Sequence, residues 1–112
     1  MGPLQDVFDH YDLLVCPTLA ALPVDNATDG NTLGPAEING ERVDPLLGWC
    51  LTYPYNFTGH PAASIPAGLS ADGLPVGLQI AGRRFADETV IAASAAFEAA
   101  RPWAATYPPR RS

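Results

Sequence analysis

The stretch NFTGHPAASIPAGLSADGLPVGLQIAG, residues 56–82, decides the fold that we predict for this chain. It contains two strand-like runs, 62–65 and 76–81, and the segment between them carries Asp72-Gly73, a pair typical of chain reversal. We therefore predict that the two runs pair closely, as in a β-hairpin.

The second run has two unlike faces. Because side chains alternate along a strand, one face is bulky and apolar and the other is nearly bare. A bare face is typical of a strand that a backbone, a helix or a ligand approaches closely. We predict tight packing of a helix there, with a ligand site as the alternative. The apolar face carries Val76, Leu78 and Ile80, and the bare face carries Gly77, Gln79 and Ala81.

Two predicted elements precede this unit. Residues 13–16 are all apolar and have the length of a strand, which is typical of a strand covered on both faces, and Pro17 should end it. Before it, four apolar residues recur at helical spacing and predict the buried side of a short amphipathic helix: Leu4, Val7, Phe8 and Tyr11.

Residues 22–44 are rich in turn signals and predict a long loop. Within it, Ile38 and Val43 flank Asn39-Gly40, which is the pattern of a small hairpin. Loops of this length are uncommon in compact domains and often serve as lids, binding segments or mobile parts. We interpret this one as mobile.

Asp44-Pro45 has the pattern of a helix N-cap followed by a first-turn proline, and the spacing after it predicts a helix that reaches Tyr53. Pro54 should prevent further extension, because its ring removes a hydrogen bond and crowds the preceding turn. Four aromatic residues of this region fit either an acyl or aryl pocket or part of the core: Trp49, Tyr53, Tyr55 and Phe57.

The last predicted element is an alanine-rich helix from Asp87, its expected N-cap, to Ala100. Arg101 precedes a proline, and such residues leave the helical region, so the helix should end there. Residues 103–112 have no periodicity and predict an extended, partly disordered tail, with Trp103 folded against the body. The expected buried face of the helix consists of Val90, Ile91, Ala93 and Phe97.

The composition of the chain limits the classes of partner and cofactor that it can have. The 112 residues fit at most one domain, and a formal net charge of −6 argues against nucleic-acid and anionic-membrane partners, which need a basic surface. We expect a cytoplasmic protein whose Cys16 and Cys50 are buried free thiols. His10 and His60 bear no metal-ligand spacing to these cysteines, and no phosphate-binding loop is present, so we expect neither a metal nor another cofactor.

Three motifs of the central stretch resemble the C-terminal part of the amidase signature family, which includes amidases, allophanate hydrolases and the amidotransferase subunit that makes Gln-tRNA. The motifs are Asn56 to Ala62, Ser64 to Gly68 and Gly73 to Gln79. Residues 11–18 match the family's strand followed by Pro-Thr, and the resemblance continues into the helix at 87–100. It implies an α/β fold with a partial mixed sheet and packing helices, so that residues 1–112 form one partial domain.

In that family the catalytic groups are a lysine and two serines, carried in a Gly/Ser-rich segment before the C-terminal part. This chain has no lysine, and its four serines stand apart from one another. A pair of Ser64 with His60 lacks a third group to orient the base. We therefore expect no catalytic residue here and no activity from this chain alone. The resemblance implies a substrate-side wall formed by Asn56, Phe57, Thr58, Gly59 and His60.

Two functions remain open. The first is the C-terminal structural and substrate-side segment of an amidase-like hydrolase that acts on carboxylic amide C–N bonds and binds a small-molecule amide only with the missing upstream part. The alternative is a non-catalytic α/β remnant or interaction module. Unpaired strand edges predict homo-oligomers or aggregates in either case.

Overall fold

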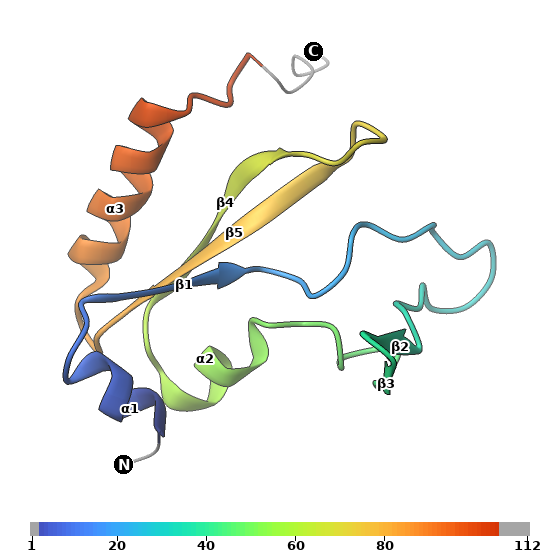
Figure 1. Cartoon of the computed structure of the whole chain (residues 1–112), viewed down its shortest axis with the longest axis horizontal. Coiled ribbons are helices and arrows are strands. Elements are labelled where there is room, and N and C mark those ends of the chain that lie inside the picture. The colour runs from blue at the N-terminus through green and yellow to red at the C-terminus, as the bar shows by residue number, and fades with distance from the viewer. Residues whose placement is uncertain (1–2, 106–112) are drawn as a thin grey trace.

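The computed structural model describes residues 3–105. The predicted extended tail therefore lies outside the described residues for 106–112. Three helices and five strands follow one another in the described part (Figure 1): α1 (Pro3–Phe8), β1 (Leu13–Pro17), β2 (Glu37–Ile38), β3 (Glu41–Arg42), α2 (Tyr53–Thr58), β4 (Ala62–Leu69), β5 (Pro75–Gly82) and α3 (Asp87–Ala100).

The hairpin predicted from residues 56–82 is confirmed. β4 and β5 pair antiparallel with Ala62 opposite Ala81 and Ser64 opposite Gln79, and the turn between them contains Gly73 at φ 80°. β1 pairs antiparallel with the other edge of β5, which gives the strand order β1-β5-β4. The expected α/β arrangement is present, and both pairings of this sheet are antiparallel within the described residues.

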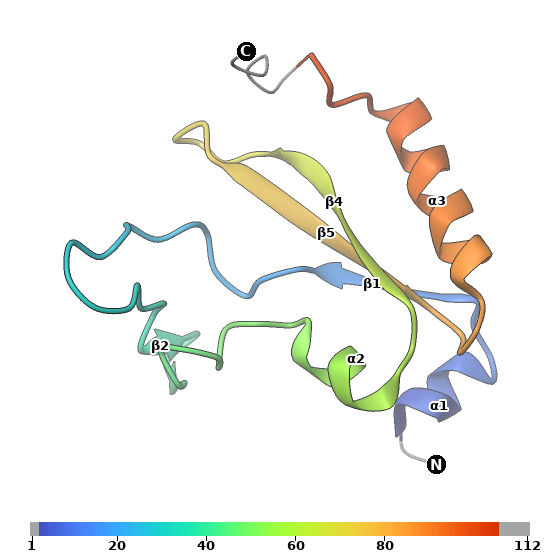
Figure 2. The same ribbon diagram turned by 180° about the vertical axis from the view of Figure 1, so that it is seen from behind.

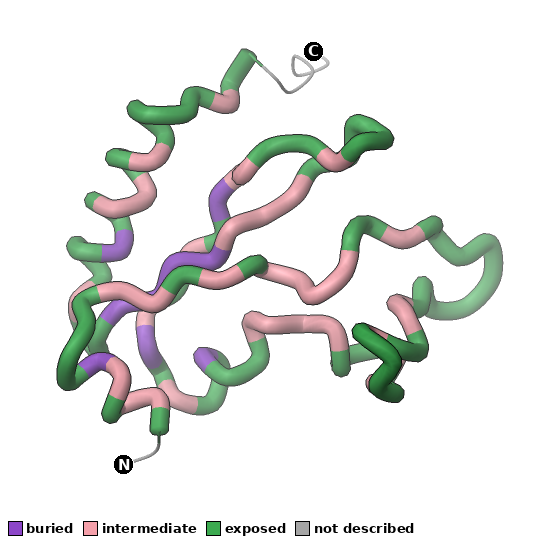
Figure 3. Tube along the Cα trace, in the orientation of Figure 1, coloured by how far each residue is buried: buried purple, intermediate pink, exposed green. Residues whose placement is uncertain are grey.

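The sheet separates two small cores. α3 covers one face, where Ile65, Ile80 and Val90 are buried together. α1 and α2 lie on the other side of the sheet (Figures 1 and 2), where Phe8 and Tyr55 pack on Ala81. Figure 3 shows the buried residues gathered along β5 and the segments that face it.

The predicted close helix packing is found at two places along β5. On the bare face, Ala81 is fully buried under α1 and α2. On the opposite face, a Cβ added at Gly82 would lie 2.7 Å from Val90 Cγ2, so α3 approaches the strand most closely there. At Gly77 the close neighbours are instead two hydroxyl side chains, those of Thr18 and Ser64.

The helix predicted from Asp44 to Tyr53 is wrong. Asp44 does accept a hydrogen bond from the Leu46 N–H at 2.8 Å, but only turns follow it. The helix instead begins at Tyr53, with Pro54 in its first turn. A first-turn residue has no intrahelical N–H bond to lose, so Pro54 starts this helix, where we expected it to stop one.

Three burial predictions are also wrong. Tyr11 lies beyond the end of α1 and is exposed, and Ile91 lies on the outer side of α3. Val15 is 52% exposed, because β1 is an edge strand of the sheet and is not covered on both faces. The Tyr11 error arises because α1 ends earlier than the helical pattern, and the other two arise because a pattern does not reveal what packs against its element.

The C-terminal helix has the predicted bounds and ends at Arg101, whose φ of −137° is not helical. Its N-cap is Ala86 rather than Asp87, which is the first helical residue. Trp103 packs against the core under α3, as predicted.

The long loop leaves the body of the molecule (Figure 1) and carries the small predicted hairpin, β2 with β3. Asn39 and Gly40 both have positive φ, at 51° and 82°. Positive φ at both central residues is the requirement of a tight two-residue turn, which explains the Asn-Gly pair.

Candidate functional site

Two cavities open beside the sheet face opposite α3, and Ser64 lines both. We call the first the Gln79 cavity. It has a volume of about 240 Å³, and it lies between α2 and the middle of β4 and β5. The second, the Thr18 cavity, has a volume of about 180 Å³ and lies at the end of β1. The bare face of β5 therefore supplies cavity walls as well as a helix-packing surface.

Gln79 forms the floor of the first cavity. Its side chain is 2% exposed, and its Nε2 donates to the Leu51 carbonyl at 2.9 Å and contacts Cys16 Sγ at 3.4 Å. Among residues 3–105 no donor reaches its Oε1, and no buried side-chain oxygen or nitrogen there lacks a partner. Oε1 is therefore not completely enclosed, and it is a hydrogen-bond acceptor held in place by the two contacts of Nε2 in a residue that lines the cavity.

His60 closes one end of the same cavity and is 6% exposed. Its ring stacks on Phe8 with the centroids 4.8 Å apart. Nε2 lies 3.3 Å from Gln5 Oε1, which can only accept, so Nε2 carries the proton and Nδ1 accepts from the Thr58 hydroxyl at 2.8 Å. Burial, and secondarily the charge of Arg84, lowers the pKa of His60, which favours the neutral ring.

Tyr55 is the second titratable group at the cavity. Burial, with a further effect from Cys16 beside it, raises the pKa of its phenol, so the hydroxyl stays protonated at neutral pH. The remaining lining residues carry no charge. The Gln79 cavity is thus an uncharged site rich in hydrogen-bonding groups, which suits a neutral polar ligand.

The five predicted substrate-side residues do not all reach the cavity. Asn56 and His60 line the Gln79 cavity. Thr58 acts on it through its hydrogen bond to His60, and Gly59 ends α2 in the left-handed conformation at φ 75°. Phe57 is 75% exposed and lies outside the cavity. Of the five consecutive residues predicted to form a substrate-side wall, the structure therefore places the first and the last at this cavity.

The aromatic residues of this region do not gather into one pocket. Tyr55 belongs to the core under α1, whereas Tyr53 contacts Phe57 edge to face with centroids 5.0 Å apart. Trp49 lies against Gly34 in the long loop. Of the two alternatives left open for this group, a shared acyl or aryl pocket is not found, and Tyr55 alone belongs to a buried core cluster of the described residues.

Three residues of the cavities were missed as site residues: Thr18, Ser64 and Gln79. Gln79 had a usable signal, because a glutamine flanked by apolar residues in a strand has to place its polar end beside a partner. Thr18 and Ser64 each lie in a motif quoted above, but no local pattern pairs them, since 46 positions separate them in the chain.

Three further findings concern residues 3–105. Their His, Cys, Asp and Glu side chains form no group of three or more that would hold a metal ion. No helix in this part of the chain has the length and apolar character needed to cross a membrane. Both cysteines are free, as predicted, but they are only half-buried, so the prediction that they are buried is wrong.

Comparison with known proteins gives one consistent result. The sequence profile of the Amidase family matches residues 3–91. The chain is 46% identical over 103 residues to an acylamidase of Rhodococcus erythropolis, covering 89% of this chain and 20% of that protein. It is 40% identical over 108 residues to a glutamyl-tRNA(Gln) amidotransferase subunit of Lacticaseibacillus casei strain BL23, covering 93% and 19%.

Comparison with solved structures gives the same family. A bacterial aryl acylamidase of the amidase signature family superimposes with a TM-score of 0.89 at 63% identity, covering 93% of this chain and 21% of that one. The corresponding amidotransferase subunit from Thermotoga maritima gives 0.60 at 38% identity, covering 89% and 20%. The fold thus matches part of the amidase signature fold, and the chain belongs to the amidase family, whose C-terminal part it resembles. It spans about a fifth of the length of these relatives.

Proposed function

We propose that this chain is the C-terminal structural and substrate-side segment of a hydrolase that acts on carboxylic amide C–N bonds. Family membership supports the reaction class. The observation that carries the proposal is the Gln79 cavity, which is lined by Asn56, Ser64 and Gln79, the last with a rigidly held acceptor Oε1. An amide presents an N–H donor beside a carbonyl acceptor, and this cavity offers the complementary groups without a charge.

The chemistry of bond cleavage needs more than these residues. A serine hydroxyl is a weak nucleophile until a base removes its proton. This chain has no lysine, and arginine stays protonated at any working pH, so it cannot serve as that base. Here the Ser64 hydroxyl is hydrogen-bonded to the Thr18 hydroxyl, not to a base. The chain alone should therefore not hydrolyse an amide.

A chimera tests this proposal. Residues 3–105 replace the matching segment of the Rhodococcus acylamidase, and hydrolysis of aryl amides is measured. We expect activity in the chimera and none in the 112-residue chain. Asn56→Ala should raise KM about three- to tenfold, the range of one lost hydrogen bond. Asn31→Ala, an exposed loop asparagine, is the matched control. Turnover by the 112-residue chain, or an unchanged KM for Asn56→Ala, contradicts the proposal.

Self-association through strand edges is part of the same proposal. In the described residues β1 pairs only with β5, and its outer edge carries the half-exposed Val15. The outer edge of β4 contains Pro66, which has no N–H to offer, and a register shift follows it. We expect the β1 edge to pair between copies, and Val15→Lys to reduce this. Light scattering that shows a monomer at all concentrations contradicts this expectation.

The free cysteines and the net charge of the chain support a proposed location and a proposed class of partner. Free cysteines are typical of reducing compartments, which supports a cytoplasmic location. The net charge of −6 disfavours nucleic acid as a partner. We therefore propose a small-molecule amide as the ligand, bound together with sequence that supplies the serines and the lysine.

A further inference from the structure

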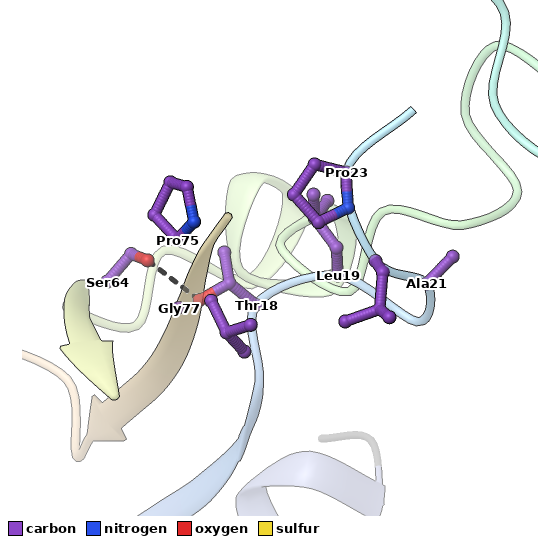
Figure 4. Close-up of a pocket in the computed structure, with 9 residues that line it drawn as sticks. Thr18, Leu19, Ala21, Pro23, Ser64, Pro75 and Gly77 are labelled. Carbon is purple, nitrogen blue, oxygen red and sulfur yellow. Dashed lines mark hydrogen bonds between the residues drawn. The ribbon is translucent and has the colours of Figure 1, made fainter. Parts of the chain in front are cut away.

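The Thr18 cavity is a second space beside the sheet, separate in lining from the Gln79 cavity except at Ser64. Figure 4 shows how it is built: Leu19, Ala21 and Pro23 come from the segment after β1, and Pro75 and Gly77 from the start of β5. A cavity of about 150 Å³ with apolar walls is large enough for benzene. At about 180 Å³, this one has room for a substituted ring or a short acyl chain.

A pair of hydroxyls forms its polar end. Thr18 Oγ1 and Ser64 Oγ are 2.7 Å apart, so one hydroxyl donates to the other (Figure 4). The hydroxyl that accepts keeps its own proton free to donate, and both oxygens keep a lone pair. The nine lining residues include no charged side chain. This arrangement favours an uncharged ligand with one oxygen, because a carboxylate would lose water without gaining a positive partner.

Gly77 makes the hydroxyl pair possible. A Cβ at this position would lie 2.8 Å from Thr18 Oγ1 and 2.9 Å from Ser64 Oγ, which is closer than real Cβ atoms come. Gly77 lies inside strand β5, so alanine fits the backbone there. The added methyl group would therefore press on the Thr18 and Ser64 side chains, which makes Gly77→Ala a probe of the hydroxyl pair.

From this geometry we infer that the Thr18 cavity binds an uncharged molecule with a compact apolar body and a carbonyl oxygen, and that the Thr18–Ser64 pair donates a hydrogen bond to that oxygen. The inference deepens the proposed function and rests on it, since the acyl part of an amide is such a group. It requires no cleavage of a C–N bond, and so it can be tested without turnover.

The test is binding of acetophenone to the 112-residue chain, followed by the methyl NMR shifts of Thr18, Leu22 and Val76. Benzoate has nearly the same shape and a negative charge, and toluene has no oxygen. We expect saturable shifts with acetophenone and binding at least about threefold weaker for the two others, as for a lost hydrogen bond. Absence of saturable shifts with acetophenone overturns the inference, as does equal binding of benzoate or toluene.

Substitutions test the residues. Thr18→Val and Ser64→Ala each remove one hydroxyl, the first just after β1 and the second in β4, and each should weaken acetophenone binding about three- to tenfold. Thr18→Ser keeps the hydroxyl and should bind acetophenone as tightly as the unaltered chain. Gly77→Ala should weaken acetophenone binding although both hydroxyls are present. Thr89→Val on the exposed side of α3 is the matched control. Undiminished binding by both hydroxyl variants overturns the inference.

Different outcomes would contradict the proposed function and the inference about the Thr18 cavity. Acetophenone has no C–N bond, so its binding says nothing about hydrolysis. If the acylamidase chimera is inactive and acetophenone still binds at Thr18, the proposed function fails alone. If the chimera hydrolyses amides and acetophenone leaves the Thr18 cavity unchanged, this inference fails alone.

Discussion

The two faces of the β1-β5-β4 sheet differ in what they leave room for. On the α3 face, apolar side chains fill the space so closely that even a methyl group at Gly82 would meet Val90. On the opposite face, the same strand presents Gln79 and Gly77, and two cavities lie beside them. One strand thus supplies stability through one set of alternate residues and candidate binding groups through the other.

The largest expected effect is on the packed face. Ile80 is buried with Ile65 and Val90, so Ile80→Ala leaves a cavity that the neighbours only partly fill. We expect the free energy of unfolding in urea to fall by about 2–5 kcal/mol. Ile91→Ala on the exposed side of α3 should change it by less than about 0.5 kcal/mol. Equal losses in the two variants would remove the distinction between the packed face and the surface of α3.

The next effect is on the open face. Gln79→Leu keeps the approximate volume but leaves the Leu51 carbonyl without its donor, which should cost about 1–3 kcal/mol of unfolding free energy. The loss should also loosen α2, because this bond ties the segment just before the helix to the sheet.

Hydrogen exchange of the α2 amides measures this loosening, with Asn31→Leu, an amide-to-leucine change in the exposed loop, as the control. If Gln79→Leu is as stable as the unaltered chain and its α2 amides exchange no faster, then Gln79 has no structural role on this face.

A smaller effect is a pH dependence at the end of the Gln79 cavity. The folded pKa of His60 lies below its ordinary 6.5, so below pH 6.5 the unfolded chain binds more protons than the folded one. Stability from this group is complete above pH 6.5 and is lost as the pH falls between the two pKa values. Unfolding measured at several pH values should show this loss in the unaltered chain and in His10→Gln, and less of it in His60→Gln.

The smallest effect belongs to neither face. Arg83 contacts Asp12 at 3.3 Å, but both side chains are largely exposed, and such pairs contribute little. Asp12→Asn should change the unfolding free energy by less than about 0.5 kcal/mol. Arg83→Ala should cost more, because it also removes the 2.8 Å bond from Nε to the Phe8 carbonyl. A larger loss for Asp12→Asn than for Arg83→Ala would reverse this ranking.

How far the sequence predicted the molecule differs between the fold and the site. The β4–β5 hairpin and α3 were predicted because their signals are local: an Asp-Gly turn, alternating side chains and a proline after the last helical turn. The start of α2 was missed, since a proline inside an apolar pattern marks the end of one helix or the first turn of the next.

The candidate site was predicted less well for a related reason. Asn56 and His60 came from a motif, and the structure places both at the Gln79 cavity. Phe57 shares that motif but points to solvent, because successive residues of a helix face different directions. Motif membership therefore identified the segment, and helix geometry selected which of its side chains reach the cavity.

The sequence by itself determined the two-faced strand of β5, the reversal at Asp72-Gly73, the C-terminal helix and the absence of a lysine that would serve as a base. These depend on residue type and on spacing over a few positions. Only the tertiary structure decided that Thr18 meets Ser64 next to Gly77, and that Gln79 lines a cavity. Such contacts join residues far apart in the chain, and the strand order that brings them together depends on packing that local pattern does not record.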